Sequence, residues 1–438
     1  AADFIVGNPP FIGASAMPAA LGDGYVQSLR ATWTDVPESA DFVMYWWHHA
    51  ACLVRSGAVR QFGLITTNSL TMIFNRRVVQ AALDGAPVAA GTAHAGGLML
   101  PNAQKSAPGT RRPGWPALSL RYAIPDHPWV DSADGAAVRV AMTVGDTASI
   151  SGRLLKVVQE VPRGDGEFEV LFDQRQGEIH ADLAVGARVA GAKRLAANAG
   201  ICFQGMNLVG KGFRLERPDV VALGYDLNAL PEVIKPHCNA RDLLQGGEHC
   251  HVIDLFGYTS EQALARHPAL FQWLYDRVKP ERDHNKDAQR QRDWWLFGRS
   301  NSSLREAWRG LKRFVVTAET AKHRVFVFQR LPFCPDHKLY AVCSEDAVVL
   351  GILSSSAHAE WALRAGGTLE DRPTWTNTTT FLPFPFPSDD TGLTPELTDR
   401  IRQLAEQLDA HRKARQAAFE SVTLTGLYNV LDKLRRGE

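Results

Sequence analysis

The chain opens with a short apolar run that two prolines bring to a stop. Residues 4–6 are apolar and lie between an aspartate and a glycine, a pattern that predicts a buried strand. Asn8, Pro9, Pro10 and Phe11 follow, and the prolines end the strand because neither can donate a hydrogen bond to a neighbouring strand. A residue before a proline favours extended geometry. We therefore expect the Asn8 side chain and the carbonyl oxygens of Asn8 and Pro9 to lie together beyond the strand, beside the Phe11 ring.

The residues after this turn predict a helix and then a second strand. Between residues 35 and 57, apolar side chains recur at three- and four-residue spacing, and a glycine is placed to end the pattern. This predicts an amphipathic helix that packs on a sheet. Residues 62–69 predict the next buried strand, with Thr67 and Asn68 at its polar tip.

A hairpin is expected further along the chain. Residues 119–124 and 136–144 predict two strands at the edge of the sheet, joined by a turn that contains Trp129. No element can be assigned to residues 85–117, where alanine, glycine and proline dominate and no periodicity is present. Short charged strands interrupted by glycines are expected from residue 145 to about residue 189.

These patterns divide the chain into three regions. Residues 1–150 predict part of an α/β domain, and residues 151–390 predict a mixed α+β domain. Residues 391–438 contain two amphipathic helical patterns, which we expect to form a closing helical hairpin or a contact for a partner.

The composition is that of a globular protein with room for two or three domains. The chain has 438 residues, of which 45% are hydrophobic and 22% are charged. It contains no run of about 18 apolar residues and no secretion signal, so we expect a cytoplasmic protein without a membrane partner. Six cysteines are too few for a disulfide framework in a chain of this length, which agrees with a reducing compartment.

The net charge of the whole chain is +1, but one segment contains an excess of cationic residues. Residues 277–324 contain thirteen lysines and arginines against six acidic residues, interleaved with aromatic side chains. Such a stretch favours contact with DNA phosphates and base edges, although a solvated helix face would have the same composition. The candidate DNA-binding residues are Lys279, Arg282, Lys286, Arg292, Arg299, Lys322, His323 and Arg324.

Two other motifs do not support a site. Residues 205–212 resemble a phosphate-binding loop, but a glycine stands where Ser or Thr should hold magnesium, so nucleotide hydrolysis is rejected. Residues 237–238 and 249–251 are rich in His and Cys, but their spacing is not that of a zinc finger or ribbon. We therefore predict no metal.

The first turn suits an exocyclic amine on a planar base. Two acceptor oxygens can hold the two N–H bonds of such an amine while an aromatic ring stacks on the base. Asn8, Pro9, Pro10 and Phe11 resemble motif IV, Asn-Pro-Pro-Tyr/Phe, of the methyltransferases that transfer a methyl group from S-adenosylmethionine to adenine in DNA. An ordinary Asn-Pro turn after a strand is the alternative reading of these four residues.

A longer resemblance extends over nearly the whole chain outside residues 85–117. The chain resembles the large single-chain adenine methyltransferases of type IIG restriction-modification and phage-exclusion systems, with a Rossmann-like sheet followed by a target-recognition domain. The matching segments are Lys-Pro-Glu-Arg at 279–282, Trp-Trp at 294–295, Lys-His-Arg at 322–324, Leu-Ser-Ser-Ser at 353–356 and Phe-Pro-Phe-Pro at 384–387.

The resemblance implies a mechanism and a partner. A target adenine would rotate out of duplex DNA, its amine would donate to Asn8 and to the Pro9 carbonyl, and Phe11 and Trp129 would flank its ring. A structural role for Trp129 is the alternative. S-adenosylmethionine would supply the methyl group, but the glycine-rich loop that binds it should precede the first strand, so its site is incomplete here.

Three hypotheses follow about the function. The chain is expected to be the later part of an adenine methyltransferase, or one partner of a split enzyme or defence system, and to be inactive alone. It would otherwise be a DNA-recognition module without activity. The third alternative is methylation of an amide such as glutamine in a protein, because Asn-Pro-Pro-Tyr/Phe also serves that reaction.

Overall fold

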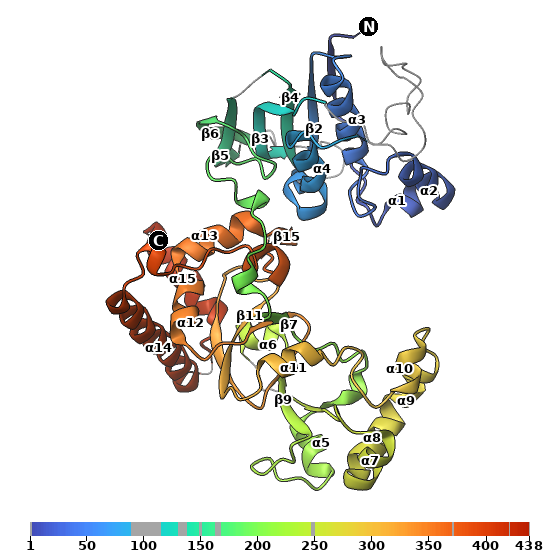
Figure 1. The fold of residues 1–438 in the computed structure, drawn as a ribbon, viewed down its shortest axis with the longest axis vertical. Coiled ribbons are helices and arrows are strands. Elements are labelled where there is room, and N and C mark those ends of the chain that lie inside the picture. The colour runs from blue at the N-terminus through green and yellow to red at the C-terminus, as the bar shows by residue number, and fades with distance from the viewer. Residues whose placement is uncertain are drawn as a thin grey trace. The chain divides into compact units, whose positions relative to one another are not determined.

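The chain forms two compact units, Ala1–Gly191 and Ala192–Glu438 (Figure 1). In the computed structural model the described residues are 2–88, 115–129, 138–148, 151–162, 168–246, 250–369, 372–419 and 421–437. The boundary that the sequence suggests, at residue 150, lies inside the first unit. Two strands that follow residue 150 continue the sheet of the first unit instead of opening a new domain.

The first unit is built on one six-stranded sheet. Its strands, in spatial order, are β1 (Phe4–Gly7), β2 (Gln61–Thr67), β4 (Val138–Asp146), β3 (Ser119–Trp129), β5 (Gly152–Pro162) and β6 (Phe168–Gly177). β1 and β2 are parallel, and β4 runs antiparallel to both β2 and β3. β1, β2 and β3 therefore point in the same direction. β5 pairs in parallel with β3, and β6 pairs antiparallel with β5.

The expected hairpin of β3 and β4 is present, but it lies in the middle of the sheet and not at its edge. β4 pairs with β2 on one side, and β3 pairs with β5 on the other. Trp129 is the last residue of β3, opposite Val138, and so precedes the turn. The turn itself, residues 130–137, lies outside the described residues.

The helices of the first unit are α1 (Met17–Leu21), α2 (Asp23–Thr32), α3 (Val43–Arg55) and α4 (Ile73–Leu83). The predicted helix corresponds to α3, which packs on the sheet: the fully buried Trp47 donates its indole N–H to Thr143 Oγ1 of β4 at 3.1 Å. α3 begins eight residues later than the sequence pattern suggests. Separate turns precede it, closed by the hydrogen bonds from the Val36 amide to the Trp33 carbonyl and from the Ala40 amide to the Pro37 carbonyl.

β1 is not the buried strand that its apolar residues predict. Among the described strands it pairs only with β2, and it forms one edge of the sheet. Val6 is 86% exposed and Phe4 is 57% exposed. A run of three apolar residues does not show whether a strand lies at the edge or in the interior of a sheet.

The second unit contains two four-stranded sheets. One has the order β13 (Cys334–Pro335), β9 (Ile234–Cys238), β10 (Cys250–Ile253) and β8 (Arg214–Leu215). The other has the order β12 (Val327–Arg330), β11 (Arg313–Ala318), β14 (Leu339–Val342) and β7 (Cys202–Gln204). The remaining described strands of this unit, β15 (Thr368–Leu369) and β16 (Arg372–Pro373), form a two-stranded sheet.

Helices surround these two sheets. They are α5 (Arg217–Ala222), α6 (Ala240–Gln245), α7 (Ser260–Arg266), α8 (Pro268–Arg277), α9 (Lys279–Asp283), α10 (Ala288–Arg292), α11 (Ser302–Ala307), α12 (Ala347–Leu353), α13 (Ser356–Ala365), α14 (Pro395–Ala418) and α15 (Leu424–Arg436). The expected mixed α/β architecture with two C-terminal helices is thereby confirmed. Within the described residues, no helix combines the length and the apolar character that crossing a membrane requires.

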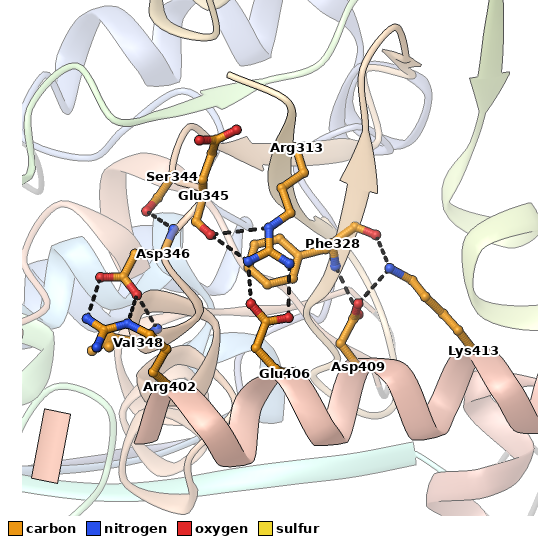
Figure 2. A network of polar contacts seen from close by, with 10 residues as sticks. All are labelled: Arg313, Phe328, Ser344, Glu345, Asp346, Val348, Arg402, Glu406, Asp409 and Lys413. Carbon is orange, nitrogen blue, oxygen red and sulfur yellow. Dashed lines mark hydrogen bonds and ion pairs between the residues drawn. The ribbon is translucent and has the colours of Figure 1, made fainter. Parts of the chain in front are cut away.

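The two C-terminal helices have different main packing partners, α12 for α14 and α6 for α15, so they do not form the simple hairpin that was expected. Polar contacts fix α14 to β11 and β12 (Figure 2). Asp409 of α14 accepts from the Phe328 amide at 3.1 Å, and Arg313 of β11 pairs with Glu406, its Nη1 lying 3.0 Å from Oε2. Arg402 reaches Asp346, which caps α12, with Nε 3.0 Å from Oδ1.

Candidate functional site

The acceptor turn lies at the carboxyl end of β1. Gly7 ends the strand opposite Leu64, and the Asn8 side chain that follows is exposed. This side chain makes no hydrogen bond to any described residue, whereas Pro9 beside it is buried. Pro9 thus anchors the turn, whereas Pro10 is exposed, and the Asn8 amide is available to a ligand.

Asp41 holds the segment after the turn in place. Its Oδ1 accepts from the Ala14 amide at 3.0 Å, and its Oδ2 accepts from Ser69 Oγ at 2.8 Å and from Asn75 Nδ2 at 2.7 Å. Next to it, the Phe42 amide donates to the Ile12 carbonyl at 2.9 Å. One carboxylate therefore joins the segment after β1 to the end of β2. Sequence reasoning missed Asp41; its position just before α3 was the only signal available.

A second polar group lies where β2 and β3 end. Asn68 donates its Nδ2–H to Asp126 Oδ1 at 3.2 Å, and Arg139 Nε lies 2.7 Å from the same oxygen. Arg139 also pairs with Glu160 of β5 at 2.7 Å. These hydrogen bonds raise the pKa of Arg139, the one to Glu160 most and the one to Asp126 next, so its charge is permanent.

The strand register places the predicted base-binding residues at one edge of the sheet. Thr67 of β2 and His127 of β3 both lie opposite Val140 of β4, and Trp129 follows His127 by two positions. Because β1, β2 and β3 run in parallel, Asn8, Asn68 and Trp129 share the carboxyl edge, where ligands of open α/β sheets bind. Phe11 is half-buried and packs against the core of the first unit, so only part of its ring is accessible.

The structure divides the predicted basic stretch into two groups, and two of its arginines donate to backbone carbonyls. Arg282 is 1% exposed and donates from Nη2 to the carbonyls of Leu208 and Leu296 at 3.0 and 3.2 Å. Arg324 donates to the Ala318 and Pro373 carbonyls, and burial lowers its pKa to about 9. Both guanidinium groups bind backbone carbonyls of the second unit. We therefore no longer count Arg282 and Arg324 among the candidate DNA-binding residues.

The first surface group belongs to α9, α10 and the residues after them. Lys286 is exposed and makes no hydrogen bond to any described residue. Lys279 pairs with Asp283 at 2.7 Å, Arg292 with Asp293 at 3.3 Å, and Arg299 Nη1 lies 3.4 Å from Gln204 Oε1. Lys286, Arg292 and Arg299 are exposed, and Lys279 is half-buried.

The second group, Lys322 and His323, follows β11. Lys322 Nζ and His323 Nε2 both lie 2.9 Å from Asn429 Oδ1 of α15. α9 and α10 lie at one end of the second unit, and α14 and α15 lie at the other (Figure 1). The predicted basic stretch is therefore two separate surfaces and not one continuous stripe.

The contrast between Lys286 and Arg282 can be tested directly. Lys286→Ala is expected to weaken duplex DNA binding for all sequences and to lower the salt dependence, −dlogK/dlog[salt], by about 1, because one phosphate contact is lost. Arg282→Ala is expected to lower the free energy of unfolding by about 2–3 kcal/mol, because a large, almost fully buried side chain is removed and the Leu296 carbonyl loses its donor. Anisotropy titrations at several salt concentrations and urea unfolding measure the two effects. An unchanged slope in Lys286→Ala would contradict the assignment of this surface.

The His and Cys segments show no metal site in the described part of the chain, where no three candidate ligands come together. His237 is fully buried and its Nδ1 lies 2.8 Å from the Cys334 carbonyl. Burial lowers the pKa of His237 to about 4, so the ring is neutral and structural at pH 7. His249 lies outside the described residues.

Comparison with solved structures gives a likeness over almost the whole chain. The chain superposes on the type IIL restriction-modification enzyme MmeI, solved in complex with DNA, with a TM-score of 0.67 at 16% sequence identity. The chain is similar in fold to a restriction-modification enzyme. The likeness covers 97% of this chain and 51% of MmeI, so the chain spans about half the length of MmeI.

Two further structures match less well. The type IIG restriction endonuclease BpuSI gives a TM-score of 0.29 at 9% identity, over 92% of this chain and 49% of BpuSI. The DrdV–DNA complex gives 0.38 at 9% identity, over 93% of this chain and 44% of that protein. No protein-family model and no curated protein sequence matches the chain. The likeness to MmeI confirms, at the level of the fold, the resemblance to restriction-modification enzymes that the motifs indicated.

Proposed function

We propose that the chain acts in site-specific methylation of the exocyclic amine of adenine in duplex DNA. The first unit would bind the flipped adenine at the carboxyl edge of its sheet, and the second unit would bind the surrounding DNA. The observation that supports this most is the exposed Asn8 amide, next to buried Pro9 and at the edge of the sheet that also holds Trp129.

The chain's own residues would bind and orient the amine. Its two N–H bonds would donate to Asn8 Oδ1 and to the Pro9 carbonyl, which reduces conjugation of the nitrogen lone pair with the ring and localises it on the nitrogen. Rotation of the base out of the duplex costs a few kcal/mol, and stacking on an aromatic ring offsets about 1–3 kcal/mol of this. Phe11 and Trp129 are the proposed rings. Positioning and electrostatics would then provide the catalysis without a covalent intermediate on the protein.

S-adenosylmethionine is the methyl donor that the resemblance implies. The described residues supply acceptors and rings for the base, but they form no glycine-rich loop between a strand and a helix next to β1. They therefore do not build a complete site for this cofactor, and no step is assigned to it here.

The test uses the chain reconstituted with a protein part that completes the S-adenosylmethionine site. It measures methyl transfer from labelled S-adenosylmethionine to duplex DNA of random sequence, followed by enzymatic digestion and mass spectrometry. We expect the label in N6-methyladenine, at a defined sequence, and none in protein. Label in a cytosine base would overturn the choice of adenine, and label in a glutamine would establish the amide alternative.

A DNA-recognition module without activity is the second candidate, because the described residues lack a complete cofactor site. Binding of duplex DNA by the purified chain, with no measurable binding of S-adenosylmethionine by calorimetry, would favour this alternative. Tight binding of S-adenosylmethionine would reject it.

A further inference from the structure

The second unit contains a cavity of about 730 Å³ that the sequence motifs did not indicate. Its walls come from α6, from residues that flank β11 and β14, from β16 and from α15. The polar residues that matter here are Arg241, Gln245, Lys322, Lys338, Arg372 and Thr425. They approach the cavity from segments separated by up to 184 positions in the chain, from Arg241 to Thr425.

The lining is strongly cationic. Four of its residues are Lys or Arg, and none of the residues that line it is Asp or Glu. Arg241 is exposed, and its side chain makes no hydrogen bond to a described residue. Lys338 Nζ lies 2.8 Å from Glu319 Oε2, a contact that neutralises one of the four charges in part. Arg241 and Lys322 pair with no carboxylate among the described residues, so the lining of the cavity does not balance these two positive charges.

The walls are held in place by contacts between elements. Gln245 Nε2 donates to Thr425 Oγ1 at 3.3 Å, and Thr425 Oγ1 donates to the Leu244 carbonyl at 3.3 Å, which joins α6 to α15. The Glu319 amide donates to the Lys338 carbonyl at 2.8 Å. Asn429 of α15 accepts from Lys322. A site assembled in this way loses little conformational entropy when a ligand binds.

We propose that this cavity binds phosphate groups of the DNA backbone. The inference rests on the proposed DNA substrate and adds Arg241 and Lys338 to the residues that hold it. A duplex presents about one negative charge per 1.7 Å of its axis, which matches a pocket lined by lysines and arginines. Phosphate contacts set the position of a protein on DNA without reading its sequence. The cavity would thus orient the duplex, and sequence choice would come from other contacts.

The experiment is a set of anisotropy titrations with duplex DNA at several salt concentrations. Arg241→Ala and Lys338→Ala should each lower the salt slope by about 1 and weaken binding by about 10-fold at 50 mM salt. Both should leave the ranking of different DNA sequences unchanged. Arg400→Ala is the matched control, because Arg400 is exposed on α14 and does not line the cavity.

The substitution Glu319→Gln should change DNA affinity in the opposite direction to the two alanine variants. Removing this carboxylate frees Lys338, so DNA binding should become several-fold tighter at low salt, a result that loss of folding cannot produce. An unchanged slope in both alanine variants would overturn the proposal, as would a changed sequence ranking, which indicates base reading. Another outcome is that inorganic phosphate stabilises the wild-type protein but neither alanine variant, while the salt dependence of DNA binding is the same in all three proteins. The cavity would then be a site for small anions and not for DNA. Because these titrations need no methyl transfer, they can succeed even if the proposed methylation fails.

Discussion

Asn8→Ala is expected to reduce methyl transfer by about 10²–10³-fold while leaving DNA affinity within about two-fold of wild type. Removing one preorganised hydrogen-bonding partner of a reacting group costs about this much in rate. Asn8 is exposed and makes no hydrogen bond to a described residue, so the fold should not depend on its side chain. Turnover of the reconstituted complex with labelled S-adenosylmethionine, measured at saturating DNA, checks the prediction.

Two companion variants make the result specific. Asn8→Gln keeps the amide but moves it by one methylene group, and it should also fail, because an error of about 1 Å can cost 10²-fold in rate. Asn228→Ala removes an exposed asparagine of the second unit whose Nδ2 bonds only to Asp226 at 3.2 Å, and it should behave as wild type. Wild-type turnover by Asn8→Ala would remove Asn8 from the proposed mechanism.

Asp254→Ala is expected to lower the free energy of unfolding by about 3–5 kcal/mol, the cost of leaving buried charges without their partner. Asp254 is 3% exposed and follows β10 in the second unit. Arg305 binds both of its carboxylate oxygens, at 2.7 and 2.9 Å, and Lys235 Nζ lies 2.8 Å from Oδ2. Two cations would lose their counter-charge. Urea unfolding followed by tryptophan fluorescence measures the change.

The pH dependence of this effect has a definite sign. Burial alone would raise the pKa of Asp254, but Arg305 and then Lys235 outweigh it and hold this pKa below its usual value. The stabilisation is therefore complete above about pH 4, where an unfolded aspartate ionises, and it is lost as the pH falls further. The difference between wild type and variant should shrink below pH 4. Asp399→Ala is the control, with less than about 1 kcal/mol expected because Asp399 is exposed on α14. An equal loss in both variants would contradict the argument.

Local patterns in the sequence located most of the elements around the candidate site. The apolar run before two prolines marked the end of β1. The spacing of apolar side chains located β2 and α3. The sequence could not tell that β1 lies at an edge, because the pairing of a strand depends on residues far away in the chain. For the same reason β5 and β6 were assigned to the second region, although they hydrogen-bond in the sheet of the first.

The predicted DNA-binding residues illustrate the limit of charge counting. Lys286 and Arg282 lie four positions apart and have the same charge, but one is exposed and the other is buried under carbonyl groups. The two residues differ in the direction of their side chains, which the charge pattern of the sequence does not reveal. Asp41 was missed because its hydrogen-bond partners Ala14, Ser69 and Asn75 are 27 to 34 residues away.

The two units have separate hydrophobic cores: one contains Trp47 and Phe62, and the others, which include Phe213 and Trp375, belong to the second unit. No buried apolar cluster of the described residues draws on both. Substitutions in the interior of the second unit can therefore accumulate without repacking the strands that position Asn8. If the proposed division of labour holds, descendants of such a protein can diverge in the DNA they select while inheriting the same chemistry.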